Sequence, residues 1–426
     1  DLQKAHRTSI FSIIHSMKEN HKPIRLHKNL AVAVINCLNS IFNQDLQADK
    51  VIAKMLKSDK RWGKRDRGFI AENTYEIIRW KRLYAELAGV KEPYAKVDLW
   101  RLLSVRWVLQ GIPLPGWDEV RGTPARRIKG RFDGLQQHRA IVCSITDWLD
   151  ELGVANFGEA QWKQEIDALN TQASVVLRVN RLQTNQKTLQ NELAAEGIET
   201  VSHQNYPDAL ILQERANVFE TNAFQRGLFE VQDASSQLVA SFTEVNPGMQ
   251  VIDACAGAGG KSLHLAALME NKGQLTALDI YPHKLHELKR RARRAGAHNI
   301  TTRHIKSNKV IKKLHGRADR VLIDAPCTGL GVLRRNPDAK WKINTDFLKR
   351  VKQTQEYILH TYATMVKPGG KLVYATCSIL KEENQSQVES FLQSEVGKQF
   401  SLEKEELISP AKSGFDGFYM ARIVRS

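Results

Sequence analysis

Cysteine is scarce in this chain, and its spacing argues against two common uses of the residue. The 426 residues include five cysteines, Cys37, Cys143, Cys255, Cys327 and Cys377. Their number is odd and no two of them form a C-x-x-C pair, so neither a disulfide framework nor a zinc site is expected. We therefore expect free thiols in a reducing cytoplasm and no metal. The default role of such a thiol is that of a small buried hydrophobe.

Long apolar runs are also missing. No stretch approaches the roughly 18 consecutive apolar residues of a membrane helix, and the first four residues carry no apolar signal-peptide core. The sequence therefore predicts no membrane association. Hydrophobic residues make up 42% of the chain, which is ordinary for a globular protein, and the length suffices for two or three domains.

Acidic residues are few relative to basic ones. Asp and Glu number 46 against 63 Lys and Arg, which gives a formal charge of +17. Such a surplus favours polyanionic partners, because each neutralised phosphate releases a counterion and adds affinity. Basic and aromatic residues are interleaved between Lys54 and Arg82. This pattern is typical either of an RNA-contacting face or of a solvated helix surface over an aromatic core. Further phosphate contacts are expected from Arg126, Arg127, Arg131, Arg334 and Arg335.

The hydrophobic pattern divides the chain into three parts. Residues 1–152 are expected to form a helical domain, with a basic linker or RNA-facing loop at 111–134 where prolines and glycines gather. Residues 153–244 alternate short β-rich runs with a helix, which predicts a small α+β module. From residue 245 to 426, apolar runs alternate with helix-length segments, the pattern of a doubly wound, mostly parallel sheet. Ligands bind such sheets at the carboxyl ends of their strands.

A glycine-rich turn follows the first strand of the third part. The strand that ends at Asp253 leads into residues 254–261, Ala-Cys-Ala-Gly-Ala-Gly-Gly-Lys, and then into a helix. Glycine lets the backbone turn tightly and approach a ligand closely. About twenty residues later Asp279 ends the next strand, where a carboxylate can hydrogen-bond ribose hydroxyls. This arrangement is typical of a site for an adenosine-bearing cofactor.

Two other nucleotide-binding patterns fit less well. An NAD fingerprint requires glycine where Ser262 stands, and the first glycine of a Walker A loop would fall at Cys255. The end of a Walker A loop does match Gly260-Lys261-Ser262, and residues 321–324 resemble a Walker B strand. Neither pattern explains the residues that follow that strand.

Two cysteines follow two different strands at the ligand-binding edge. Cys327 stands in Asp324-Ala-Pro-Cys-Thr-Gly and Cys377 in Ala375-Thr-Cys-Ser. Cytosine C5 becomes nucleophilic only after a group adds covalently at C6, and a thiolate does this well in an electropositive site. Asp324 is placed to hydrogen-bond or protonate N3 of the base. Methylation of an exocyclic nitrogen needs no such thiol. One cysteine alone would favour a structural thiol, whereas two beside a cofactor loop favour catalysis.

These motifs resemble those of the RsmB/Sun-type RNA (cytosine-5) methyltransferases. The resemblance covers roughly residues 170–426. The matching segments are residues 229–237, 253–261, 278–280, 319–331, 334–338, 340–341, 367–370, 375–378, 382–384 and 416–418. It implies a Rossmann-like class I methyltransferase domain with a seven-stranded, mostly parallel sheet, and a small RNA-binding α+β module before it. Residues 65–72 resemble the N-terminal all-α NusB-like domain of the branch that modifies ribosomal RNA.

The resemblance also assigns roles to residues. It implies that Cys377 is the nucleophile, that Cys327 assists release of the product, and that Asp324 contacts the base with Lys261 nearby. The residues that it implies for S-adenosylmethionine are Cys255, Ala256, Gly257, Ala258, Gly259, Gly260, Lys261, Asp279 and Asp324. The chain departs from the family twice. Ala258 replaces a proline, and Asn308 stands where an acidic residue usually contacts adenine, so we expect its amide to take that contact.

The sequence thus predicts a cytoplasmic, monomeric enzyme that methylates C5 of a cytosine in RNA, and the RNA is expected to be ribosomal RNA or a ribosomal subunit precursor. In a DNA cytosine-5 methyltransferase the Pro-Cys thiol attacks, which would leave Cys377 unexplained. A ribosome-assembly factor with an inactive domain would not need Asp324 and both cysteines. Residues 289–294 are expected to be the exposed face of a helix, and His264 and His283 to be packing or capping residues.

Overall fold

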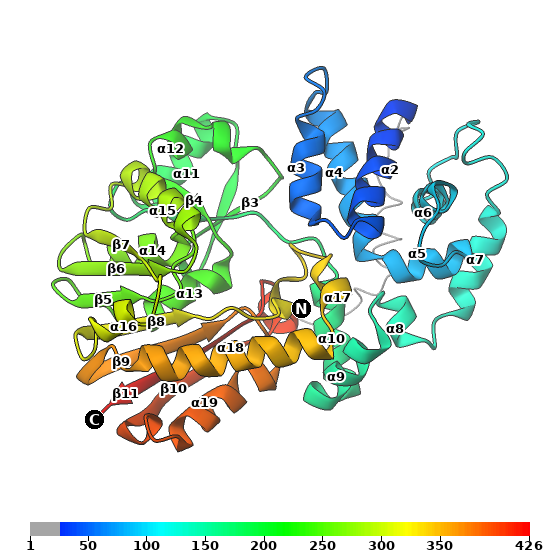
Figure 1. Ribbon diagram of the computed structural model, residues 1–426. Coiled ribbons are helices and arrows are strands. Elements are labelled where there is room, and N and C mark those ends of the chain that lie inside the picture. Colours follow the sequence, from blue (N-terminus) through cyan, green and yellow to red (C-terminus); the bar gives the residue numbers. More distant parts are fainter. Residues whose placement is uncertain (1–25) are drawn as a thin grey trace. The chain divides into compact units, whose positions relative to one another are not determined.

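The computed structural model describes residues 26–426 (Figure 1), so the predictions for residues 1–25 lie outside the described part of the chain. It divides into two compact units. The first, the helical unit, extends to Thr171 and also includes Leu333–Ile343. The second, the sheet unit, comprises Gln172–Val332 and Asn344–Ser426.

The helical unit is built of helices, as expected for the N-terminal part of the chain, but it differs from the expectation at residues 111–134 and at its C-terminal boundary. Its helices are α2 (Lys28–Asn43), α3 (Ala48–Leu56), α4 (Lys64–Arg79), α5 (Lys81–Ala88), α6 (Lys96–Leu109), α7 (Ala125–Gly134), α8 (Arg139–Val142), α9 (Asp147–Phe157), α10 (Glu159–Leu169) and α17 (Ala339–Lys342). Helix α7 lies inside the stretch expected to be a linker, because Ile128 and Phe132 recur at helical spacing and are buried in the core. The unit also reaches Thr171 instead of the expected residue 152, because α10 buries Trp162 and Ile166.

Residues 333–343, which lie within the expected third domain at 245–426, belong to the helical unit. In residues 333–343, the fully buried Lys340 Nζ donates to the carbonyl of Arg79 at 2.7 Å and to Asn170 Oδ1 at 2.9 Å. Trp341 Nε1 donates to the carbonyl of Ile78 at 2.8 Å. Arg334, expected to contact phosphate, is instead 8% exposed, and its carbonyl accepts a hydrogen bond from Arg79. That expectation was wrong for Arg334.

The sheet unit begins with the predicted α+β module. Its four-stranded antiparallel sheet has the order β2-β3-β1-β4. The elements are β1 (Val176–Val179), α11 (Gln186–Ala195), β2 (Thr200–His203), β3 (Tyr206–Leu212), η2 (Val218–Glu220), α12 (Asn222–Gln225) and β4 (Phe229–Val231). Leu177, Leu189, Leu210 and Phe229 are buried between the sheet and α11 and α12. Short strands and a helix were expected here, although β2 and β4 are too short or too exposed to give an apolar run.

The second sheet has seven strands in the order β10-β11-β9-β8-β5-β6-β7 and confirms the predicted fold class. The strands are β5 (Gln250–Asp253), β6 (Gln274–Asp279), β7 (Ile300–His304), β8 (Ala318–Asp324), β9 (Val366–Thr376), β10 (Phe400–Ile408) and β11 (Phe418–Arg425). β5 to β9 are parallel, and β10 and β11 form an antiparallel edge.

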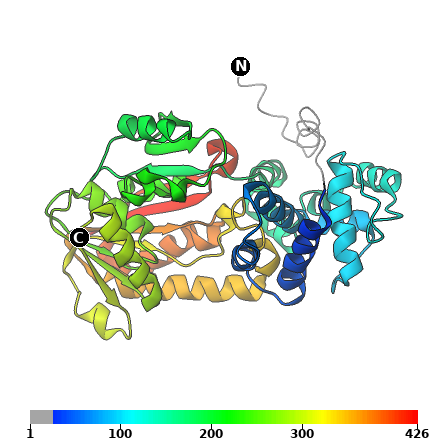
Figure 2. The same cartoon turned by 90° about the horizontal axis from the view of Figure 1, so that it is seen from above.

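Helices cover both faces of this sheet, because its central strands alternate apolar side chains between the two faces. Helices α13 (Ala234–Phe242), α14 (Gly260–Leu268) and α15 (Pro282–Ala295) pack on the face that carries Val251 and Leu322. Helices α16 (Lys309–Lys312), α18 (Thr345–Ala363) and α19 (Gln385–Gln393) pack on the face that carries Ile252 and Val321. Figure 2 shows α18 running along its face. Within residues 26–426, no helix is both long and apolar enough to span a membrane.

Candidate active site

The conformation of the glycine-rich turn between β5 and α14 depends on glycines with positive φ and on hydrogen bonds to the Asp279 carboxylate. Gly257 and Gly259 have φ of +54° and +88°, which glycine adopts without strain. A Cβ at Gly259 would also stand 2.5 Å from Leu288 Cγ. At the end of β6, the Asp279 carboxylate accepts the N–H of Gly257 at 2.8 Å and that of Tyr281 at 2.7 Å. The carboxylate therefore fixes the turns after two neighbouring strands.

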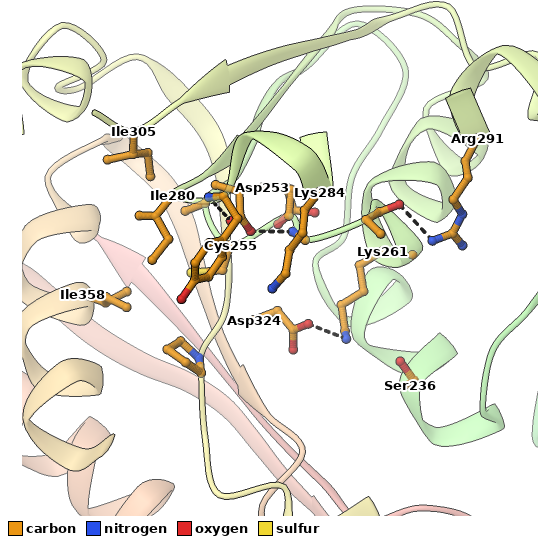
Figure 3. A pocket seen from close by; sticks show the side chains of 18 of the residues that line it. Ser236, Asp253, Cys255, Lys261, Ile280, Lys284, Arg291, Ile305, Asp324 and Ile358 are labelled. Carbon is orange, nitrogen blue, oxygen red and sulfur yellow. Dashed lines mark hydrogen bonds and ion pairs between the residues drawn. The ribbon is translucent and has the colours of Figure 1, made fainter. Parts of the chain in front are cut away.

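A cavity of about 480 Å³ lies above this turn (Figure 3). Its volume is within the range of small-molecule sites, about 300–1,000 Å³. The predicted cofactor residues that line it are Cys255, Ala256, Gly257, Ala258, Gly260, Lys261, Asp279 and Asp324. Gly259 is not in the lining and packs against Leu288 instead. Asn308 is not in the lining either, and its Oδ1 accepts the hydroxyl of Tyr357 at 2.7 Å. The structure therefore does not bring Asn308 to the cavity.

Several lining residues were not singled out from the sequence. Apolar ones are Ile280, Ile305, Ile358 and Tyr362, and polar ones include Gln232, Ser236, Lys284 and Arg291. The guanidinium of Arg291 donates to the Ala258 carbonyl at 2.9 Å, and Arg178 of β1 donates to the carbonyl of Gly260. Arg291 belongs to the basic run of residues 289–294, which was expected to be the exposed face of a helix. This expectation holds for only part of the run, because Arg291 lines the cavity. Apolar walls beside a carboxylate suit an adenosyl group, and the residues present fit the predicted cofactor.

Lys261 and Asp324 form an ion pair at the edge of the cavity (Figure 3), with Nζ 2.6 Å from Oδ2. Burial acts to lower the pKa of Lys261, but the charge and hydrogen bond of Asp324, with a smaller contribution from negative charge on Cys377, raise it above its usual value. Lys261 Nζ also lies 5.2 Å from the ring centroid of Phe418. The pair therefore holds the Lys261 ammonium group within electrostatic reach of Cys377.

Cys327 and Cys377, which follow β8 and β9, come together. Their Sγ atoms are 3.3 Å apart, so one thiol donates a hydrogen bond to the other. The hydrogen bond to Cys377, burial, and the charges of Cys377 and Glu383 all raise the pKa of Cys327 well above its usual value. Cys327 therefore holds its proton more tightly than an ordinary cysteine.

Three of the other candidate residues are buried as expected, whereas His283 is exposed. Burial raises the pKa of Cys37 to about 11 and that of Cys143 to about 12, so both remain neutral thiols inside the helical unit. His264 is buried, its Nε2 lies 3.0 Å from Asp208 Oδ2, and burial lowers its pKa to about 4. It joins α14 to β3 of the α+β module. His283 lies exposed at the start of α15.

Asp279 offers a direct test of the cofactor cavity. Replacing it with alanine removes a charged acceptor of two backbone N–H groups, and hydrogen bonds to charged groups contribute about 1.5–3 kcal/mol each. We expect the affinity for S-adenosylmethionine to fall about 10- to 100-fold in titration calorimetry. The control is Asp346→Asn, a change at an exposed residue of α18, which should leave the affinity for S-adenosylmethionine unchanged. Unchanged affinity in Asp279→Ala would place the cofactor elsewhere.

Comparisons with known proteins agree with this geometry. Residues 241–424 match the family described as 16S rRNA methyltransferase RsmB/F, and residues 146–219 match the RsmF/B-like ferredoxin-like domain. The probable ribosomal RNA small subunit methyltransferase B of Bacillus subtilis is 39% identical over 218 residues, which are 51% of this chain and 48% of that relative. The ribosomal RNA small subunit methyltransferase B of Yersinia enterocolitica is 35% identical over 274 residues, 62% of this chain and 63% of the relative.

The alignments therefore span from about half to just under two thirds of the length of these relatives. Among solved structures, that of PH0851 has a TM-score of 0.80 at 24% identity, and the match covers 94% of this chain and 100% of that one. This likeness concerns the fold. Through its methyltransferase and ferredoxin-like domains the chain belongs to the RsmB/F family of S-adenosylmethionine-dependent methyltransferases, as the motifs predicted.

Proposed function

We propose that the protein transfers a methyl group from S-adenosylmethionine to C5 of a cytosine in ribosomal RNA, through a covalent bond between Cys377 and C6 of the base. The main support is the pair of thiols 3.3 Å apart, which follow the neighbouring strands β8 and β9, together with the Lys261–Asp324 ion pair that lines the cofactor cavity at the end of β8. The small subunit rRNA in the names of the relatives supports ribosomal RNA as the substrate.

The residues divide the chemistry among them. The Cys377 thiolate adds to C6, and the electrons of the C5–C6 double bond are delocalised toward N3, to which the Lys261–Asp324 pair donates a hydrogen bond or a proton. A proton given to N3 returns to this pair when the product is released. C5 is now nucleophilic. S-adenosylmethionine supplies the methyl group, to which C5 bonds as the carbon–sulfur bond breaks and S-adenosylhomocysteine leaves.

Release requires a base for the C5 proton. While Cys377 is a thiolate, its charge and hydrogen bond keep the pKa of Cys327 high. Once that charge is used in the bond to C6, Cys327 loses its proton to water more readily and its thiolate takes the proton from C5. The C–H electrons restore the C5–C6 double bond, and the bond from C6 to sulfur breaks to return the Cys377 thiolate.

The RNA must present an unpaired base to these thiols. Inside a duplex C6 is stacked and inaccessible, and flipping a base costs a few kcal/mol, so a loop or junction is the expected target. Exposed cations of α7 support a phosphate-contacting role for the helical unit, namely Arg126, Arg127, Lys129 and Arg131. The monomeric state stays a prediction.

Analysis of the methylated nucleoside tests this function. The protein is incubated with unmodified 16S rRNA and S-adenosylmethionine that carries a labelled methyl group, and the digested RNA is analysed by mass spectrometry. We expect the label in 5-methylcytidine. Label in N4-methylcytidine or in another base would refute C5 chemistry. Cofactor and RNA binding without any transfer would instead favour a non-catalytic assembly factor.

A further inference from the structure

A buried carboxylate lies behind the two thiols. Glu383 ends the short helix η4 (Lys381–Glu383), which follows the Thr-Cys-Ser motif, and its side chain is 0% exposed. Its Oε1 accepts the N–H of Thr328 at 2.8 Å and Gln355 Nε2 at 3.0 Å. Its Oε2 accepts the hydroxyl of Thr328 at 2.6 Å and that of Ser378. The carboxylate thus has four donors around it.

Three of these donors come from the two cysteine loops, and the fourth comes from α18. Thr328 directly follows Cys327, and Ser378 directly follows Cys377. Gln355 of α18 also donates to the carbonyl of Pro326, the residue before Cys327, at 3.0 Å. Glu383 is therefore a single group to which the residues next to both thiols are hydrogen-bonded.

The site requires a carboxylate in particular. All four contacts are donations to Glu383, and a carboxylate offers about four lone-pair positions and no donor. A glutamine would keep the shape but replace one acceptor oxygen with an NH2 group that faces donors. Because the group is fully buried, each unmet contact would carry a desolvation cost.

The charge of Glu383 also reaches the thiols. After the hydrogen bond to Cys377, burial and the charge of Cys377, the charge of Glu383 is a further cause that raises the pKa of Cys327. Loss of that charge would therefore ease deprotonation of Cys327. A residue that only supported the fold would leave this titration unchanged.

We propose that Glu383 is a positioning residue that fixes the loops of Cys327 and Cys377 so that the two thiols work as a pair on one base. The inference rests on the proposed function. It adds a residue that does not line the cofactor cavity and that acts through the residues next to the two thiols, Thr328 and Ser378, and through its charge.

The test compares Glu383→Gln with Glu389→Gln, an exposed glutamate six residues later on α19. In Glu383→Gln we expect kcat for methyl transfer to fall about 100-fold, the effect of misplacing reacting groups by about 1 Å. The KM for S-adenosylmethionine should change less than twofold. Glu389→Gln should match the wild type in both constants.

A second readout needs neither RNA nor methyl transfer. Alkylation of Cys327 by iodoacetamide is followed against pH by peptide mass spectrometry, and in Glu383→Gln its profile should move to lower pH. If the wild type makes no 5-methylcytidine but this profile moves, the proposed function fails while the link between Glu383 and Cys327 stands. A wild-type kcat together with an unmoved alkylation profile would overturn the role of Glu383.

Milder variants cover the case in which Glu383→Gln does not fold. Ser378→Ala removes one donor from the Cys377 loop, and Thr328→Val removes the hydroxyl donor from the Cys327 loop. Each should lower kcat about tenfold with an unchanged KM for S-adenosylmethionine, as the loss of one hydrogen bond to a charged group predicts. Wild-type kcat in both variants would overturn the proposal.

Discussion

Replacing Cys377 with alanine is expected to lower methyl transfer at least about 1,000-fold while S-adenosylmethionine still binds with nearly native affinity. The thiol is the only proposed group that can add to C6, and without this addition C5 is not nucleophilic. The side chain is absent from the lining of the cofactor cavity, so its removal should leave cofactor binding intact. Transfer of labelled methyl to RNA and titration calorimetry measure the two quantities separately.

The control for Cys377→Ala is Cys37→Ala, which removes a buried thiol of the helical unit. We expect this variant to retain methyl transfer, although loss of the buried sulfur costs some stability. Substantial activity in Cys377→Ala would show that another group attacks C6, and the mechanism proposed above would be wrong.

The variant Cys327→Ala should behave differently, because it removes the proposed base and leaves the nucleophile. We expect a covalent protein–RNA complex to accumulate until it includes most of the enzyme, visible as a band of low mobility on a denaturing gel. The methyl group would already be on C5, so the trapped RNA should carry the label from S-adenosylmethionine. The double variant Cys327→Ala/Cys377→Ala is the control and should give no such band.

The opposite pattern would reverse the roles of the two thiols. An adduct that requires Cys327 and persists in Cys377→Ala would make Cys327 the nucleophile, as in the DNA cytosine-5 methyltransferases. The raised pKa of Cys327 makes it the less reactive nucleophile and thus favours the roles proposed above.

Much of the cofactor site could be predicted because its signals are local in the sequence. The turn after β5 requires glycine at positions with positive φ, and Asp253, Asp279 and Asp324 each end a parallel strand. Carboxyl ends of neighbouring parallel strands meet at one edge, so the sequence order alone brings these residues together. The closeness of Cys327 and Cys377 follows in the same way, because β8 and β9 are neighbours.

Other features depend on contacts that no local pattern reports. Asn308 was placed near the cofactor by its position after the third parallel strand, yet the chain turns there so that Ile305 faces the cavity and Asn308 meets Tyr357. β10 is exposed at seven consecutive positions and therefore shows no apolar alternation. Residues 333–343 read as part of the catalytic domain, but Lys340 finds its acceptors on Arg79 and Asn170.

Glu383 illustrates the same limit within the site. The sequence segment that contains it matched the family, but its role depends on Thr328 and Gln355, which lie 55 and 28 residues away in the chain. A glutamate just before a helix, as Glu383 is before α19, would ordinarily be read as a residue that stabilises the helix N-terminus. Only the fold brings both cysteine loops to its carboxylate.

The most direct test of covalent C5 chemistry uses RNA in which the target cytidine carries fluorine at C5. Fluorine cannot leave as a proton does, so an enzyme that adds to C6 and methylates C5 stays bonded to this RNA. Digestion of the complex and mass spectrometry then identify the attached residue. The mechanism predicts an RNA fragment bonded to Cys377. The C5 atom of the trapped base should carry a methyl group only when S-adenosylmethionine was present. A fragment attached to Cys327, or no adduct from an enzyme that methylates ordinary RNA, would contradict it.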